Sequence, residues 1–140
     1  MLNYLKALRV AMIAHKGQKD KGGKTYIFHT LKVSFGEKGM NEKIVALLHD
    51  VVEDTDTLME KLNFLTDEQK EALNLLTHDK KVPYFDYINN LKCNEIARVV
   101  KLSDLRHKSN LNRLKTVSEK DKKRMEKYII AQDILTKILQ

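Results

Sequence analysis

The sequence has few of the residues that cross-link or interrupt a fold. Its 140 residues include one cysteine, one proline, no tryptophan and five glycines, all of which precede Met40. The single cysteine, Cys93, excludes a disulfide framework and a thiolate metal cluster, and it indicates a reducing compartment. No apolar run approaches the roughly 20 residues that span a bilayer, and no secretory leader is evident. We therefore expect a cytoplasmic protein without a membrane partner.

Strand signals are also nearly absent, because Val and Ile do not alternate with polar residues over any long stretch. Apolar residues recur instead at helical spacing. With 42% apolar and 32% charged residues, the chain can bury one core of respectable size. These features predict an all-α bundle of roughly seven to eight helices, in a single domain over residues 1–140.

The first expected helix covers residues 2–16 and buries an apolar stripe of Leu2, Leu5, Leu8, Met12 and Ile13. The remaining helices are expected to begin at turn or cap residues, which are Tyr26, Asn41, Thr55, Thr66, Pro83, Asn94 and Ser118. The helix after Asn41 would run unbroken over residues 42–52. The long helix after Asn94 is expected to include Leu111.

The chain carries excess positive charge, with 26 basic and 19 acidic residues and a net charge of +7. This balance suggests an anionic partner, and a nucleotide, a nucleic acid or an acidic surface would each satisfy it. Residues 15–26 form a loop rich in lysine and glycine, whose amides and cations could surround a phosphate. The lysines of this loop are Lys16, Lys19, Lys21 and Lys24. A solvated linker of the same composition is the alternative.

The segment Ala46–Thr55 places four ionisable residues at the end of an apolar run. His49 and Asp50 lie among residues that would be buried, where an unpaired polar group costs roughly several kcal/mol. On one continuous helix, Glu53 and Asp54 would follow one turn later and face the same point. A metal ion with an acid–base pair beside it is one interpretation. A buried His–Asp hydrogen bond with two helix-end carboxylates is the other.

Two more polar residues interrupt apolar helix faces. His29 lies on or beside the apolar face of the second expected helix, and Asp104 stands between two leucines of the long helix. An ion pair with Lys108 or a contact with His107 would explain Asp104 alone. Together with the His–Asp pair above, however, these residues supply two imidazoles and two carboxylates from three helices. Such mixed ligands suit Mn, Fe, Co or Zn better than Ca.

Four motifs follow one another in a specific order: His-x-Gly-Gln, Tyr-Ile-x-His, Ala-Leu-Leu-His-Asp-Val-Val-Glu-Asp-Thr and Val-Lys-Leu-Ser-Asp. This order resembles the hydrolase domain of the RelA/SpoT homologues, and it is similar to their small stand-alone forms. These HD-superfamily enzymes degrade guanosine tetra- and pentaphosphate alarmones. The resemblance covers roughly residues 7–114, so the last expected helix adds little to it.

The resemblance implies an HD-type helical bundle that hydrolyses a 3′-pyrophosphate ester and releases pyrophosphate with the help of one Mn²⁺ ion. The residues that it implies are the metal ligands His29, His49, Asp50 and Asp104 and the water-orienting and proton-handling residues Glu53 and Asp54. Lysines near such a site could neutralise the pyrophosphate, and we expect Lys21, Lys24 and Lys108 to bind the substrate. Another divalent ion, such as Fe, Co or Zn, remains an alternative to Mn.

Two positions depart from the family pattern. Asp20 stands where the family has an arginine that stacks on guanine, and Lys108 stands where it has an asparagine near the ribose and base. An HD phosphohydrolase of another nucleotide or phosphoester is therefore the first alternative. The second is a non-catalytic module that binds a nucleotide or nucleic acid, although basic residues are spread over most helices. The sequence leaves the oligomeric state and the roles of His15, His78 and His107 open.

Overall fold

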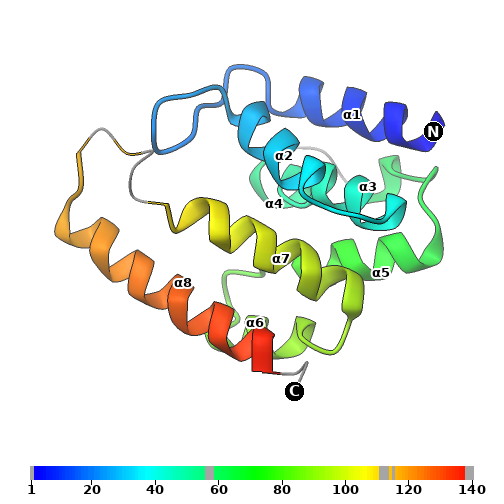
Figure 1. Ribbon diagram of the computed structural model, residues 1–140. Helices are drawn as coiled ribbons and strands as arrows, with labels where there is room; N and C mark the ends of the chain where they lie inside the picture. Colours follow the sequence, from blue (N-terminus) through cyan, green and yellow to red (C-terminus); the bar gives the residue numbers. More distant parts are fainter. Residues whose placement is uncertain (1, 56–58, 111–113, 115, 138–140) are drawn as a thin grey trace.

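The computed structural model describes residues 2–55, 59–110, 114 and 116–137. Within these ranges the chain is helical, and the only strand-like feature is an isolated bridge between Lys19 and Thr25. The elements, drawn in Figure 1, are α1 (Leu2–Ala14), α2 (Tyr26–Phe35), α3 (Met40–Leu48), α4 (Val51–Asp54), the 3₁₀ turn η1 (Met59–Lys61), α5 (Asp67–Leu76), α6 (Tyr84–Leu91), α7 (Glu95–Lys108) and α8 (Glu119–Lys137). The predicted all-α bundle is confirmed.

Helix α3 is the centre of the packing, because it contacts α1, α2, α5 and α7. Every residue from Ile44 to Val51 is buried. Helix α7 crosses the middle of the molecule, and α8 packs against α7 and α6 on the far side from α1 (Figure 1). The apolar residues of α3 belong to two core clusters, one shared with α7 and α8 and one shared with α1 and α5. This arrangement places the end of α3 between α2 and α7.

Several predicted helix starts are confirmed by their caps. Thr66 and Gln69 form a reciprocal capping box at α5, and the Asn94 side chain accepts a hydrogen bond from the Ala97 amide at α7. Ser118 and Asp121 exchange hydrogen bonds at the start of α8. The prediction for Asn41 is wrong, since Gly39 is the N-cap of α3. The predicted helix start at Thr55–Asp56–Thr57 lies partly outside the described residues. Leu111 lies wholly outside them.

The expected continuous helix over residues 42–52 is interrupted. Helix α3 ends at Leu48, His49 and Asp50 form a turn, and α4 begins at Val51. Successive residues of a straight helix point about 100° apart, so an unbroken helix would aim these two side chains in different directions. The turn lets both reach one buried point, and it also changes where Glu53 and Asp54 lie.

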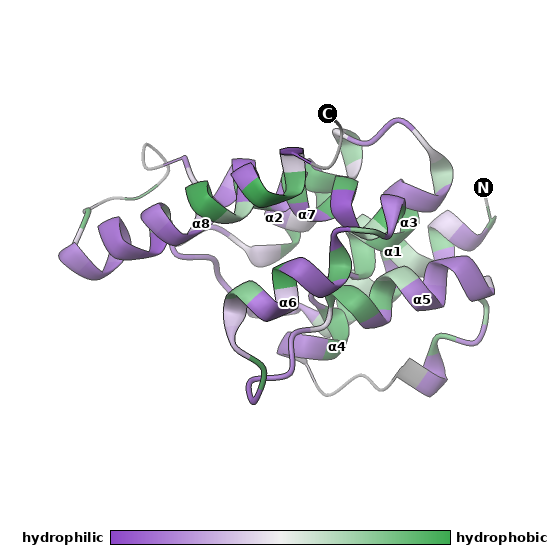
Figure 2. Cartoon of the chain, turned by 90° about the horizontal axis from the view of Figure 1, so that it is seen from below, coloured by the Kyte–Doolittle hydropathy of each residue, from purple (hydrophilic) through white to green (hydrophobic). Residues whose placement is uncertain are grey.

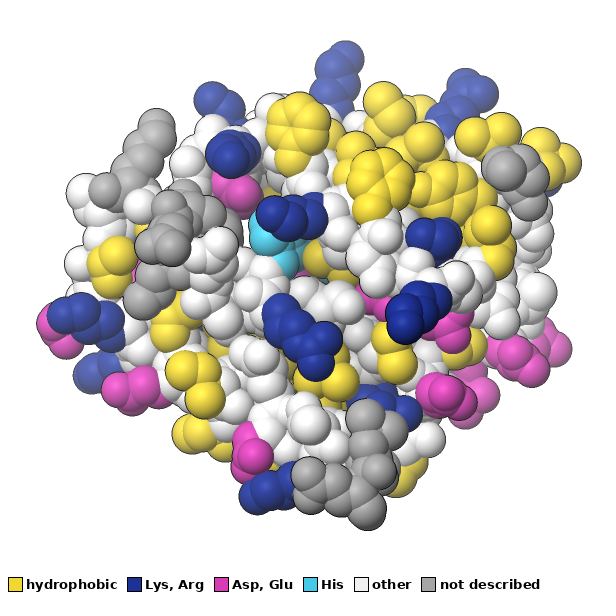
Figure 3. Space-filling model, in the orientation of Figure 1, with side chains coloured by type: hydrophobic (Ala, Val, Ile, Leu, Met, Phe, Trp, Pro, Cys, Tyr) yellow, Lys and Arg dark blue, Asp and Glu magenta, His cyan; other side chains and the backbone are white. Residues whose placement is uncertain are grey.

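The predicted core face of α1 is wrong at four of its five residues, and Leu8 alone of them packs against the core. Bulky side chains of the predicted stripe are exposed: Leu2 by 66%, Leu5 by 53%, Met12 by 55% and Ile13 by 65%. The fully buried residues of α1 are Ala7 and Ala11, whose small side chains allow a close approach to α3. Figure 3 shows hydrophobic side chains gathered on the face where α1 and α2 lie. Apolar periodicity located the helix but not its buried side.

Helix α8 differs from the other long helices in its surface. Figure 2 shows its first half coloured hydrophilic, and its buried residues are only Met125, Ala131 and Leu135. The first half of α8 is therefore mostly polar, and a few apolar residues hold the helix to the core that it shares with α7. None of the helices in the described part of the chain has both the length and the apolar character needed to cross a bilayer.

Candidate metal centre and cleft

Four buried side chains from separate elements meet at one point. His29 comes from α2, His49 and Asp50 from the turn after α3, and Asp104 from α7. Each of the four residues offers one nitrogen or oxygen atom as a ligand, and these four atoms all lie within 4.8 Å of one another. Nε2 of His49 lies 2.9 Å from Oδ2 of Asp50 and 3.2 Å from Oδ1 of Asp104. The structure thus brings together the complete predicted ligand set.

Neighbouring groups fix the orientation of these side chains. Nδ1 of His49 lies 2.6 Å from the carbonyl oxygen of Ala46. A carbonyl can only accept, so Nδ1 carries a hydrogen and Nε2 is the atom that faces the cluster. The Tyr26 hydroxyl donates a hydrogen bond to Asp50. Both features leave the ligand atoms directed at the centre of the cluster.

The cluster has the charge that a cation would need. Burial alone would raise the pKa of Asp104, but Lys108 and Lys101 outweigh it and hold this pKa well below its usual range. Burial would likewise lower the pKa of His49, but Asp50 and Asp104 raise it to about 10, so the two carboxylates hold a positive charge on this ring. A bound metal ion would take the place of the proton on Nε2. Two ionised carboxylates and two imidazole nitrogens at one buried point fit a divalent transition-metal ion.

The ion pair considered as an alternative for Asp104 is also present. Nζ of Lys108 lies 3.3 Å from Oδ1 of Asp104, and Nζ of Lys101 lies 3.1 Å from its Oδ2. These pairs do not replace the cluster, because Nε2 of His29 is 2.8 Å from the same Oδ1. Asp104 therefore serves both as a member of the cluster and as the partner of two lysines.

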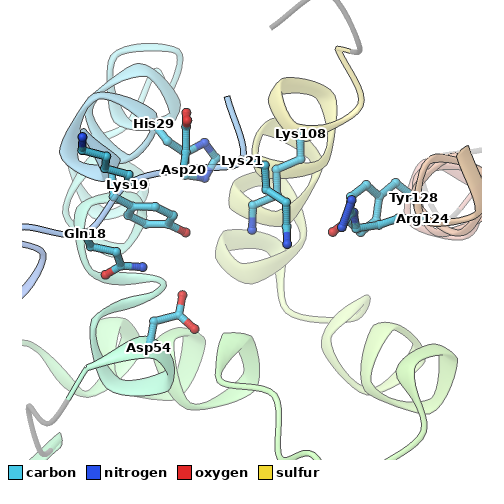
Figure 4. Close-up of a pocket in the computed structure, with 10 residues that line it drawn as sticks. Gln18, Lys19, Asp20, Lys21, His29, Asp54, Lys108, Arg124 and Tyr128 are labelled. Atoms are coloured by element: carbon cyan, nitrogen blue, oxygen red, sulfur yellow. The ribbon is translucent and has the colours of Figure 1, made fainter. Parts of the chain in front are cut away.

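A cavity of about 510 Å³ opens beside the cluster. Its lining, which Figure 4 draws as sticks, consists of Gln18, Lys19, Asp20, Lys21, Tyr26, His29, Asp54, Lys108, Arg124 and Tyr128. In this view Lys21 and Lys108 lie together on one wall, Arg124 and Tyr128 project from α8, and Asp54 points in from below. The lining combines several cations with a carboxylate and an aromatic ring.

The two predicted catalytic carboxylates lie on different parts of this region. Asp54 lines the large cavity, whereas Glu53 lines an adjoining cavity of about 160 Å³. Oε2 of Glu53 accepts a hydrogen bond from the backbone amide of His78 at 3.1 Å. Burial and the charge of Asp50 raise the pKa of both carboxyl groups. Lys108 and Tyr128 line both cavities, so the two lie side by side, and we refer to them together as the cleft.

The predicted substrate lysines are placed unequally. Lys21 and Lys108 line the large cavity, but Lys24 does not. The loop is closed around Asp20, whose carboxylate accepts hydrogen bonds from the amides of Gly22 and Lys24. Because of this tight turn, the side chain of Lys24 is exposed outside the cavity.

Sequence reasoning missed the contribution of α8 and of the aromatic side chains. Arg124 and Tyr128 are four residues apart and share a helix face, a spacing that could have indicated a common role. His78, which the sequence left open, joins Tyr84 and Tyr87 on the wall of the smaller cavity. Their rings form a packed group in which His78 stacks on Tyr87.

The other two open histidines are now placed. Nδ1 of His107 lies within hydrogen-bond distance of Nδ1 of His29, and the two rings stack with centroids 4.7 Å apart. His107 therefore supports a cluster member from the outer side. Nδ1 of His15 is 2.9 Å from Oε1 of Gln18, and its ring lies against Tyr26.

Several known proteins are similar to this chain in sequence. No protein-family model matches the chain. A chloroplastic protein of Arabidopsis thaliana named as a GTP diphosphokinase is 37% identical in an alignment of 114 residues, which covers 72% of this chain and 12% of that protein. A guanosine-3′,5′-bis(diphosphate) 3′-pyrophosphohydrolase of Aquifex aeolicus is 44% identical in an alignment of 61 residues, which covers 41% of this chain and 9% of that protein. The chain thus spans only about a tenth of the length of these relatives.

A solved structure extends the comparison to the whole fold. It is a metazoan orthologue of SpoT, described as hydrolysing ppGpp and acting in starvation responses. The two structures superpose with a TM-score of 0.76 at 22% sequence identity, over 96% of this chain and 86% of the other. This similarity establishes a shared fold.

Proposed function

The chain belongs to the RelA/SpoT homologues, and we propose that it is a metal-dependent hydrolase that removes pyrophosphate from a pyrophosphorylated guanosine nucleotide. One observation carries the proposal: the buried cluster of His29, His49, Asp50 and Asp104 borders a cleft lined by cations. A His–Asp hydrogen-bond network that only stabilised the fold would not require a cation-lined cleft beside it. The free thiol of Cys93 supports action in a reducing, cytoplasmic compartment.

The same four residues would hold the metal ion. Two nitrogen and two oxygen ligands favour Mn²⁺, Fe²⁺, Co²⁺ or Zn²⁺, and the resemblance to the family selects Mn²⁺ among these. When bound, a divalent ion supplies Lewis-acid polarisation of a phosphoryl group and lowers the pKa of water. The contribution of the chain is to keep the ligands ionised and oriented, through Lys101, Lys108 and the Ala46 carbonyl.

Asp54 and Glu53 are the proposed proton acceptors for the attacking water. Asp54 lines the cavity that also contains His29, so a water beside the cluster lies within its reach. Glu53 lines the adjoining cavity, where it accepts a hydrogen bond from the His78 amide. Their raised pKa values make both carboxylates stronger bases than exposed ones, which suits general-base catalysis near neutral pH.

The cations of the cleft are the proposed phosphate contacts. Lys21 and Lys108 lie together on one wall, and Arg124 faces them from α8 (Figure 4). A pyrophosphate group carries several negative charges, which these side chains would neutralise while excluding water. Lys24 is assigned a weaker, long-range contribution, because its side chain lies outside the cavity.

One observation favours a second candidate, a phosphohydrolase of another nucleotide. Asp20 lines the cavity at the position where the family has a guanine-stacking arginine, and its carboxylate is used to close its own loop. An anion in this place cannot stack on a base as a guanidinium does. The base that binds here would then be recognised by other residues.

A substrate panel distinguishes these candidates. The metal-loaded protein is assayed for pyrophosphate or phosphate release from guanosine 3′,5′-bis(diphosphate), its adenosine counterpart and nucleoside 5′-di- and triphosphates, with each of the four metals. We expect the highest kcat/KM with the guanosine 3′-pyrophosphate and Mn²⁺. Preference for a nucleotide without a 3′-pyrophosphate would establish the second candidate. Binding without any turnover would favour a non-catalytic module.

A further inference from the structure

Helices α1 and α2 carry a surface that the catalytic cleft does not use. Large apolar side chains on these helices are exposed to water: Leu2, Leu5, Met12, Ile13, Phe28 and Phe35. The two helices contact each other, and hydrophobic side chains gather over them (Figure 3). None of the six residues lines the cleft. We call the surface that they form the α1–α2 face.

This face is larger than the scattered apolar exposure of an ordinary surface. Phe28 is 61% exposed and Phe35 is 68% exposed. An aromatic side chain has about 150–250 Å² of surface to bury, so each of the two leaves on the order of 100 Å² open to water. The four side chains of α1 are each more than half exposed as well. Contiguous apolar patches beyond a few hundred Å² mark interaction sites, so we expect this face to have a partner.

The side chains of the face repeat with the spacing of a packed helix pair. The row on α1 is Leu2, Leu5, Arg9 and Met12. The row on α2 is Phe28, Lys32 and Phe35. Each row advances alternately by three and four residues, which is the spacing along which one helix packs against another. The occupant that this spacing indicates is a third helix.

The charges of the face all have one sign. Helices α1 and α2 contain no aspartate or glutamate, whereas Lys6, Arg9 and Lys32 are exposed. Arg9 and Lys32 stand within the two apolar rows, between their neighbours, and not at the edges. A facing helix with carboxylates at these two points would pair with both cations while it covered the apolar side chains.

Two other occupants fit these charges less well. In a symmetric dimer the same patch of both subunits meets, so the cations of the face would oppose one another. A helix that lies on a lipid surface keeps its cations on the polar side. Insertion of this face would instead carry Arg9 and Lys32 towards the acyl chains together with the phenylalanines, which is costly for a charge.

We propose that the α1–α2 face binds an amphipathic helix of a partner protein, in which carboxylates stand between apolar anchors. Leu5, Met12 and Phe35 receive the apolar anchors. Arg9 and Lys32 pair with the carboxylates. Helix α2 also supplies His29, and α1 packs on α3, so the bound helix lies behind the elements that build the metal centre. The proposal does not depend on the hydrolase reaction.

The test uses three synthetic amphipathic helices of about 20 residues, with leucine along the seam and glutamate, glutamine or lysine beside it. Binding of each peptide to the full chain is followed by residue-resolved ¹H–¹⁵N NMR. We expect the glutamate peptide to bind roughly tenfold more tightly than the lysine peptide, because only its charges complement the face. The saturable shifts should fall on amides 2–14 and 26–35.

Two substitutions separate the charge from the apolar contact. Arg9 and Ile13 are exposed on α1, so Arg9→Glu and Ile13→Ser should leave the protein folded. Arg9→Glu should weaken the glutamate peptide roughly tenfold and strengthen the lysine peptide. Ile13→Ser should weaken both peptides. Ile129→Ser, which changes an exposed isoleucine of α8, is the matched control and should bind as the wild type does.

Equal affinity for the three peptides, or shifts confined to residues outside α1 and α2, would overturn the proposal. Sedimentation of the free protein tests the second copy, and a dimer that Ile13→Ser dissociates would assign the face to self-association instead. Vesicles that contain phosphatidylserine test the lipid surface. Binding to these vesicles that Ile13→Ser abolishes, with no binding of the glutamate peptide, would overturn the proposal in favour of a membrane.

Discussion

Nε2 of His29 lies 2.8 Å from Oδ1 of Asp104, although the two residues are 75 positions apart in the sequence. This contact joins α2 to α7 through the buried interior. Because His49 reaches the same oxygen from the end of α3, the candidate metal centre exists only where three helices dock. Assembly of the centre and stability of the fold are therefore linked, and a bound ion should stabilise the protein.

Asp104→Asn tests the metal centre through this linkage. The wild type should show a higher thermal midpoint with added Mn²⁺, by about 2.7 kcal/mol of stabilisation at a hundred times the dissociation constant. The variant removes the ligand charge at the junction of α2, α3 and α7, so we expect no rise. Asp133→Asn on the exposed side of α8 is the control and should respond as the wild type does. A normal Mn²⁺ response in Asp104→Asn would contradict the assignment.

Tyr26→Phe tests a supporting residue that the sequence did not reveal. Its hydroxyl donates to Asp50, so its loss should leave that ligand less well oriented. Loss of a partner behind a metal ligand lowers affinity by about 10–100-fold. Mn²⁺ titration followed by electron paramagnetic resonance measures this change. Tyr4→Phe, a half-buried tyrosine of α1, should have unchanged affinity, and equal affinities in the two variants would refute the role of Tyr26.

Paired substitutions in α1 test which face is buried. Ala11 is fully buried, so Ala11→Leu should overpack the contact with α3 and cost about 1–3 kcal/mol of unfolding free energy. Ile13 is largely exposed, so Ile13→Ser should change stability by less than about 0.5 kcal/mol. Urea unfolding measures both. A larger loss of unfolding free energy in Ile13→Ser than in Ala11→Leu would show that the face predicted from apolar periodicity is the buried one.

Glu37→Gln tests the buried carboxyl that follows the end of α2 by its dependence on pH. Burial raises the pKa of Glu37 above its ordinary value of 4.5, so the folded state binds this proton more tightly than the unfolded state. Its contribution to stability is complete below pH 4.5 and is lost as the pH rises through the folded pKa. The variant should therefore match the wild type at pH 4 and become increasingly more stable than it towards pH 8. A difference that is constant with pH would contradict this account.

Local signals in the sequence predicted much of the fold. Thr66 and Asn94 were correct as caps because capping depends on neighbouring residues alone. The four members of the cluster were found because ionisable residues inside apolar stretches require a partner. The buried side of α1 was missed, since both of its faces are apolar and only the fit of Ala7 and Ala11 against α3 decides between them.

Features that depend on tertiary contacts could not be predicted in this way. The break at His49 and Asp50 arises because both side chains turn towards groups on α2 and α7. Arg124 reaches the cleft only because α8 packs across α7, and Arg98 is buried by a loop that lies about 60 residues earlier in the sequence. Neither arginine stands in a local pattern that marks it out.

The most direct test of the central claim is the stoichiometry of products from guanosine 3′,5′-bis(diphosphate) and Mn²⁺, followed by ³¹P NMR. The wild type should release one pyrophosphate and one guanosine 5′-diphosphate per substrate. Glu53→Gln, which keeps the oxygen that accepts from His78, should bind Mn²⁺ normally and lower kcat by about 10²–10⁴-fold. Absence of pyrophosphate release by a folded, metal-loaded wild type, or full activity in Glu53→Gln, would contradict the account.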